Sequence, residues 1–226
     1  MKVLVIAPHA DDETLGCGGT MARLADEGHE VTVAILTGHG DDEPHPLWGR
    51  DYFDLIRSEA EEAHALLGVA KTLLREIPSV SVSQQPLWYV NRVVAAVFEE
   101  VQPDSVFVPF QFDLHADHRA LFSACSVAWR PNSETGRRIR NIYAYETPSE
   151  THWNFANVEP GFTPNCWMDI SDHLDRKVAA LRCFTSQIDP APGARSIEAL
   201  ESLARWRGSQ VHLAAAEAFV TVRHIR

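Results

Sequence analysis

The chain has 226 residues, of which 45% are hydrophobic and 23% charged, and its formal net charge is −11 at pH 7. This length is sufficient for one sizeable hydrophobic core, and the composition is that of an ordinary globular protein. The negative charge disfavours nucleic acids and anionic membranes as partners, because both are bound through a basic surface.

Short apolar runs alternate with helical patterns through the first two thirds of the chain. We predict strands at about residues 2–7, 31–36, 73–77, 105–110 and 139–145, and helices at about 12–26, 51–67, 87–101 and 116–129. After residue 146 the pattern is looser, with helices expected at about 172–186 and 196–207 and a last strand near 218–225. This alternation favours an α/β fold, a Rossmann-like three-layer α/β/α arrangement with a mainly parallel sheet. No linker divides the chain, so we predict a single domain over 1–226 whose C-terminal third completes the pocket.

The cysteines indicate the cellular compartment. Cys17, Cys125, Cys166 and Cys183 are far apart and form no CxxC pair. Their spacing favours reduced thiols over a zinc ribbon or a disulfide framework. The sequence has no signal-peptide h-region and no apolar stretch of the ~20 residues that a membrane span needs. We therefore expect a cytoplasmic protein.

Two groups of histidines and carboxylates each follow a predicted strand. The first contains His9, Asp11 and Asp12, and the second contains Asp113, His115, Asp117 and His118. Ligands bind at the carboxyl ends of strands in open α/β sheets, so we expect the groups to form two halves of one site. A spacing of three residues brings His9 close to Asp12, and His115 close to His118. The combination is typical of a catalytic metal centre.

Catalytic zinc has three protein ligands and one open position for water. We expect three of the residues His9, Asp12, His115 and His118 to bind the metal. The metal would lower the pKa of the water towards ~7, and Asp11 would act as the general base. The remaining histidine would stabilise the oxyanion and protonate the leaving group. The spacing alone does not distinguish His115 from His118 as the ligand.

The two motifs, together with shorter matches along the chain, resemble a known family. His9-Ala-Asp-Asp-Glu13 looks like the HPDDE motif of the PIG-L/LmbE-like de-N-acetylases, and His115-Ala-Asp-His118 looks like their HPDH motif. Further matches extend over nearly the whole chain, at Thr37-Gly38, Arg57, Leu67-Gly68, Phe162-x-Pro-Asn165, Asp169-Ile-Ser171, Lys177, Ala180-Leu181, Ser186-Gln187 and Ala216-Glu217-Ala-Phe219. Ala10 and Ala116 stand where both family motifs usually have proline, which removes no ligand but leaves φ less restricted.

The resemblance implies a role for each residue of the two motifs. His9, Asp12 and His118 would bind Zn²⁺, with another divalent metal as an alternative. Asp11 would be the general base, and His115 would stabilise the tetrahedral intermediate. The implied reaction removes an N-acetyl group from a GlcNAc-like sugar or glycoconjugate, releasing acetate and a free amine.

The resemblance also concerns three residues outside this set. The resemblance implies that Asp117 orients one of the histidines and that Arg57 contacts polar groups of the substrate. An ion pair with Glu61 on the same helix is the alternative for Arg57. Some branches of the family have tyrosine at the position of Asp113, and an aspartate cannot assist the intermediate in the same way. The family also makes a homo-oligomer plausible.

Other interpretations of the sequence remain. Gly16-Cys-Gly-Gly19 lacks the third glycine of a dinucleotide fingerprint, because Met21 stands there. A signalling receiver module would need a phospho-acceptor Asp after the third strand, and residues 73–82 contain none. A non-haem iron oxygenase would share the His-x-Asp pattern but commonly has an all-β fold. An amidase acting on a thiol conjugate or another non-sugar amide would use the same zinc centre.

Several aromatic and histidine residues could border the pocket. Trp153, Phe155, Phe162 and Trp167 are candidates for a wall that stacks on a sugar ring, although we favour the core for Trp167. His39 and His45 lie in the polar loop at 37–46, above the expected site. We expect His64 to be at the surface or half-buried.

Overall fold

The computed structural model describes residues 1–41, 45–155 and 157–226, so part of the loop at 37–46 lies outside the described residues. The elements in chain order are β1 (Lys2–Ala7), α1 (Asp12–Asp26), β2 (Glu30–Gly38), α2 (Arg50–Leu67), β3 (Lys71–Pro78), the 3₁₀ turn η1 (Val82–Gln84), α3 (Leu87–Val101), β4 (Ser105–Pro109), α4 (Ala116–Ala128), α5 (Glu134–Arg138), β5 (Asn141–Tyr145), α6 (Pro148–Thr151), β6 (Cys166–Asp169), α7 (Leu174–Leu181), α8 (Ile197–Ser209) and β7 (Ala216–His224).

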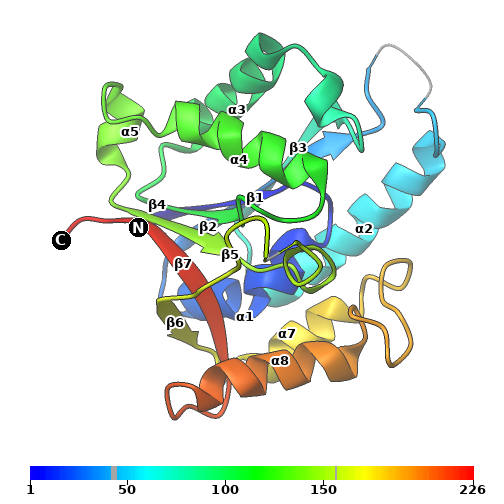
Figure 1. The fold of residues 1–226 in the computed structure, drawn as a ribbon, viewed down its shortest axis with the longest axis vertical. Coiled ribbons are helices and arrows are strands. Elements are labelled where there is room, and N and C mark those ends of the chain that lie inside the picture. The colour runs from blue at the N-terminus through cyan, green and yellow to red at the C-terminus, as the bar shows by residue number, and fades with distance from the viewer. Residues whose placement is uncertain (42–44, 156) are drawn as a thin grey trace.

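The strands form one sheet in the order β3-β2-β1-β4-β5-β7-β6. Neighbours from β3 to β5 are parallel, whereas β7 is antiparallel to both β5 and β6. Helices α3 and α4 cover one face, and α1, α2 and α7 cover the other (Figure 1). The prediction of a mainly parallel sheet in an α/β/α arrangement is confirmed.

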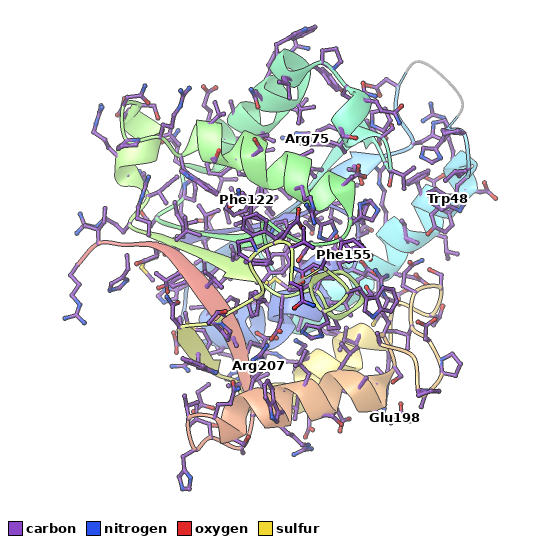
Figure 2. All side chains as sticks on the ribbon, in the orientation of Figure 1. Trp48, Arg75, Phe122, Phe155, Glu198 and Arg207 are labelled. Carbon is purple, nitrogen blue, oxygen red and sulfur yellow. The ribbon has the colours of Figure 1, made fainter. Side chains whose placement is uncertain are left out.

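Burial on both faces explains why the residues of β1 after Lys2 are all apolar. Leu4 and Ile6 point into the core beneath α3 and α4, while Val3 and Val5 point into the core beneath α1 and α2. Phe122 of α4 belongs to the first of these cores (Figure 2). Each fully buried side chain of this size contributes roughly 1.5–3 kcal/mol to folding.

The position of β1 determines where a ligand can bind. From β1 the chain continues to β2 on one side, and it later returns to β4 on the other side. This change of direction is a topological switch point, where the loops diverge and leave a crevice at the carboxyl ends of the strands. The segments that follow β1 and β4 carry the two predicted groups of residues, so the topology brings the groups together.

The C-terminal third supports the first helix. Helix α1 is interrupted at Cys17, which has non-helical φ and ψ of −144° and 26°. Glu217 of β7 accepts hydrogen bonds from the backbone N–H groups of Gly19 and Thr20 at 2.9 and 2.7 Å. Lys177 of α7 donates to Glu217 at 2.5 Å. Glu217 is therefore buried in the fold, where it stabilises the backbone near the kink.

Some local expectations were wrong. The helix expected at 172–186 is shorter, and the sequence did not predict α5, α6 or the strand β6. His64, expected at the surface or half-buried, is buried. Both of its ring nitrogens have partners there: Nε2 lies 3.0 Å from Glu13 of α1, and Nδ1 lies 2.8 Å from Thr72 of β3. Within the described ranges, no helix has the length and apolar character required to cross a membrane.

Candidate active site

The two predicted groups meet at the carboxyl edge of β1 and β4. Ring nitrogens of His9, His115 and His118 lie within 4.8 Å of one another. The Oδ2 atom of Asp12, the first residue of α1, lies 3.2 Å from Nδ1 of His9 and 3.1 Å from Nε2 of His118. The backbone N–H of His9 also donates to this oxygen, at 2.9 Å. The Asp12 carboxylate and two imidazole nitrogens thus converge on one point.

Two further carboxylates orient the histidines. Asp113 Oδ2 lies 2.8 Å from His118 Nδ1, and Thr151 donates to the other oxygen of Asp113 at 2.5 Å. Asp117 Oδ2 lies 3.1 Å from His9 Nε2. A carboxylate on one ring nitrogen determines the tautomer and leaves the opposite nitrogen for a metal. Asp113 therefore directs Nε2 of His118, and Asp117 directs Nδ1 of His9, towards Asp12.

Asp117 also holds the segment after β3. Its carboxylate accepts hydrogen bonds from the backbone N–H of Val80 at 2.6 Å and of Val82 at 3.1 Å. The backbone N–H of Asp117 donates to Nδ1 of His115 at 3.1 Å, where His115 caps the N-terminus of α4. Neutral His115 consequently carries its proton on Nε2.

The residues present fit a divalent cation. Among the described residues, His118 Nε2 and Asp12 Oδ1 are buried polar atoms without a hydrogen-bond partner. Burial lowers the pKa of His118, but Asp12 and Asp113 outweigh it and raise that pKa to about 10. Burial likewise opposes protonation of His9, yet Asp117 and Asp12 raise its pKa to about 9. The carboxylates therefore favour positive charge here, and two nitrogen ligands with one carboxylate oxygen form a set that zinc accepts.

Asp11 lies beside this group at the start of α1. Its φ of 148° is unusual for a residue with a side chain, and only 3% of its surface is exposed. Burial raises the pKa of Asp11 to about 7, against the opposing effect of Arg195, whose Nη1 donates to Asp11 Oδ2 at 2.6 Å. A buried carboxyl group that titrates near neutral pH is suited to proton transfer.

The His115 ring lies against the ring of His9. The centroids of the two rings are 4.5 Å apart. Burial, together with the nearby His9 and His118, lowers the pKa of His115 to about 4. The neutral ring can donate a hydrogen bond from Nε2.

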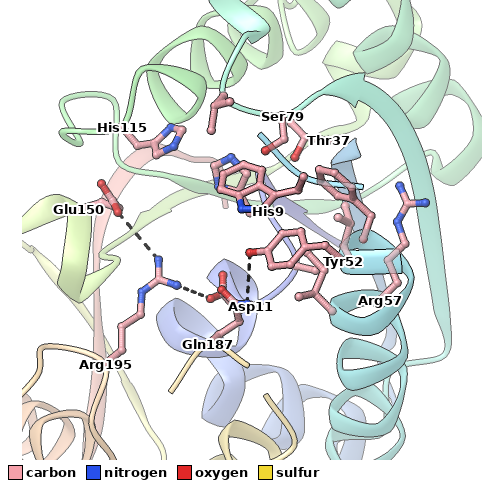
Figure 3. A pocket seen from close by; sticks show the side chains of 16 residues that line it. His9, Asp11, Thr37, Tyr52, Arg57, Ser79, His115, Glu150, Gln187 and Arg195 are labelled. Carbon is pink, nitrogen blue, oxygen red and sulfur yellow. Dashed lines mark hydrogen bonds and ion pairs between the residues drawn. The ribbon is translucent and has the colours of Figure 1, made fainter. Parts of the chain in front are cut away.

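A pocket opens over these residues (Figure 3). Its walls include Trp48, Tyr52 and Phe53, and the rings of Trp48 and Tyr52 are stacked with centroids 5.1 Å apart. Trp153, Phe155, Phe162 and Trp167 were candidates for an aromatic wall, but none of the four lines this pocket. Trp153 and Phe155 are exposed, Phe162 packs against the core, and Trp167 donates to Gln210.

Arg57 lines the pocket, but its nitrogens already have partners. Nη1 donates to Glu76 at 2.6 Å, and Nη2 donates to the carbonyl of Arg75 at 3.1 Å. The partner is thus Glu76 rather than Glu61. In Figure 3 the Arg57 side chain lies along α2, apart from Asp11 and His115. Substrate contact by Arg57 stays a prediction.

The loop histidines stabilise the loop itself. His39 Nε2 accepts from the backbone N–H of His45, and His45 Nδ1 accepts from that of Trp48. Both histidines line a second cavity next to the pocket, together with Trp88 and Arg92.

Sequence reasoning missed two partners of the site. It placed Asp113 near the metal but did not predict its contact with His118, although the two residues are close in sequence. It gave no role to Arg195, which lies 184 positions from Asp11 in a loop that carries no motif. A long-range contact of this kind leaves no local signal in the sequence.

Known proteins share this family and fold. The family model described as PIG-L, GlcNAc-PI de-N-acetylase, matches residues 4–129, more than half of the chain. Diacetylchitobiose deacetylase of Thermococcus kodakarensis is 29% identical over 203 residues, covering 82% of this chain and 70% of the relative. The structure of N,N'-diacetylchitobiose deacetylase from Pyrococcus horikoshii, 26% identical, superposes with a TM-score of 0.74 and covers 97% of this chain and 83% of that one. A relative with another activity, 4-oxalmesaconate hydratase of Pseudomonas putida, is 22% identical and covers 82% of this chain and 74% of the relative.

Proposed function

The chain belongs to the PIG-L family, and we propose that it is a metal-dependent hydrolase that removes the N-acetyl group of a GlcNAc-like sugar or glycoconjugate. The observation that carries the proposal is the convergence of His9, Asp12 and His118 beside the buried carboxyl group of Asp11. The similar deacetylases of diacetylchitobiose support this choice of bond and substrate.

The metal is the first element of the proposed mechanism. His9, Asp12 and His118 would hold it, and Asp113 and Asp117 would orient the two histidines. We propose Zn²⁺, because imidazole and carboxylate suit it. When bound, the ion would polarise the amide carbonyl and make water more acidic.

Two residues of the chain would move or hold protons. Asp11 takes a proton from the attacking water, so that the water oxygen bonds to the amide carbon. His115, neutral and protonated on Nε2, donates a hydrogen bond to the oxygen on which negative charge develops. The C–N bond then breaks, the nitrogen receives a proton from Asp11 or His115, and acetate and the free amine are the products.

We also propose where the enzyme acts. The described cysteines are all free, which supports our proposal of a cytoplasmic enzyme. A homo-oligomer and a single domain over 1–226 also stay predictions.

The test is a screen for acetate and free amine over GlcNAc, diacetylchitobiose, GlcNAc conjugates and non-sugar acetamides. We expect turnover of at least one acetylated sugar by the wild type and by His224→Ala, which removes an exposed histidine at the end of β7. His115→Ala should lower kcat by about 10²–10³-fold, the loss typical of a removed oxyanion donor. Release only from non-sugar amides, or hydration of an unsaturated acid without amide hydrolysis, would contradict the proposed function.

A further inference from the structure

We propose that Arg195 is a positioning residue, which holds the carboxylate of Asp11 in the orientation needed for proton transfer. This inference rests on the proposed function, because it concerns how the general base is kept in place. Arg195 comes from the loop between α7 and α8 and lines the same pocket as Asp11 and His115 (Figure 3).

The Arg195 guanidinium is itself fixed on two sides. Its Nη1 donates to Asp11 Oδ2 at 2.6 Å, and its Nε donates to the hydroxyl of Ser149 at 2.8 Å. Its Nη2 lies 3.9 Å from a carboxylate oxygen of Glu150. Ser149 and Glu150 belong to α6, the short helix after β5. The planar guanidinium makes directional contacts. Its contacts with Ser149 and Glu150 therefore determine where it meets Asp11.

Asp11 needs an external restraint for two reasons. Its backbone has a φ of 148°, which is strained for a residue with a Cβ, so the turn alone does not favour this conformation. Its carboxylate also stands beside those of Asp12 and Glu13 in a buried region, where like charges repel strongly. Arg195 supplies a cation at the one oxygen that it contacts.

The contact distinguishes the two oxygens of Asp11. Oδ2 is occupied by Arg195, whereas no hydrogen bond among the described residues involves Oδ1. The χ2 torsion of an aspartate is only weakly restrained. A hydrogen bond to one carboxylate oxygen therefore fixes the position of the other oxygen as well. Oδ1 is then the oxygen that accepts the proton.

The first test compares Arg195→Ala and Arg195→Lys with Arg205→Ala, a matched control on the exposed side of α8. Arg195→Ala should lower kcat by about 10–100-fold with KM within about twofold, because misplacing a catalytic group by 1 Å can cost 10²-fold. Added guanidinium should restore part of the activity of Arg195→Ala and leave the control unchanged. A rise in KM with unchanged kcat would overturn the proposal in favour of substrate binding.

The second test is a double-mutant cycle of Asp11→Asn and Arg195→Ala. Their effects on kcat should not multiply, because Arg195 acts through Asp11, and their shifts in the thermal unfolding midpoint should also be non-additive. Additive shifts in the midpoint would overturn the ion pair, even if no acetylated substrate were turned over. Absence of turnover in the wild type, with a non-additive midpoint, would instead contradict the proposed function.

Discussion

The Asp113–His118 contact provides a quantitative prediction for metal affinity. Asp113 is fully buried, and its Oδ2 lies 2.8 Å from Nδ1 of His118. Asp113→Ala removes a charge-assisted hydrogen bond, for which about 1.5–3 kcal/mol is typical. Loss of such a partner usually weakens metal binding by about 10–100-fold, equivalent to about 1.4–2.8 kcal/mol. We therefore expect the zinc Kd of Asp113→Ala to rise by one to two orders of magnitude.

Three further variants separate orientation from general disruption. Asp113→Asn keeps an acceptor for the His118 N–H but loses the charge, so its Kd should rise by about tenfold. Thr151→Val removes the hydrogen bond to the other oxygen of Asp113, together with the one that the hydroxyl accepts from the backbone N–H of Thr147, and should have a smaller effect on the Kd because the Asp113–His118 contact stays. Asp172→Asn changes an exposed aspartate and should leave the Kd unchanged. The assay is competition for zinc with a chromophoric chelator, and a Kd for Asp113→Ala within about twofold of wild type would show that Asp113 does not orient His118 for metal binding.

Three other outcomes follow from the same structure. Asp11→Asn should retain the metal in elemental analysis yet lose about 10²–10⁴-fold in kcat, and an active variant would show that Asp11 is not the base. His118→Ala should not retain the metal after dialysis; a full complement of metal would exclude His118 as a ligand. Burial opposes ionisation of Glu146, but His152 and Arg207 lower its pKa below the usual 4.5. The ionised Glu146 therefore stabilises the fold fully above pH 4.5, the pKa of the unfolded state, and this stabilisation is lost as the pH falls through the lower pKa of the folded state. Melting curves should show that Glu146→Gln loses less stability on acidification than the wild type.

The main layers of the fold were predictable because they follow from local patterns. The apolar run at 3–7 is long enough for a strand and buried on both faces, and Gly28 and Gly68 follow helices that end near them. The two His/Asp groups each follow a strand, and the strand order places β1 next to β4. Local sequence therefore predicted both the sheet and the meeting of His9 with His118.

The rest depends on contacts between distant segments. The strand β6 has only four residues and lies at the edge of the described sheet, paired with β7, so its sequence has no clear strand pattern. The burial of His64 depends on Glu13, which lies on another helix. Arg195 reaches Asp11 because the loop between α7 and α8 lies beside α6 and the start of α1, and this packing is not encoded in any short motif.

We propose that His9, Asp12 and His118 hold a metal needed for amide hydrolysis. The most direct measurement follows acetate release and bound metal together, in the purified enzyme, after chelation and after stoichiometric zinc is added back. We expect about one zinc per chain, loss of acetate release on chelation, and recovery on readdition in the wild type but not in His118→Ala. Acetate release at the wild-type rate from metal-free protein would contradict it.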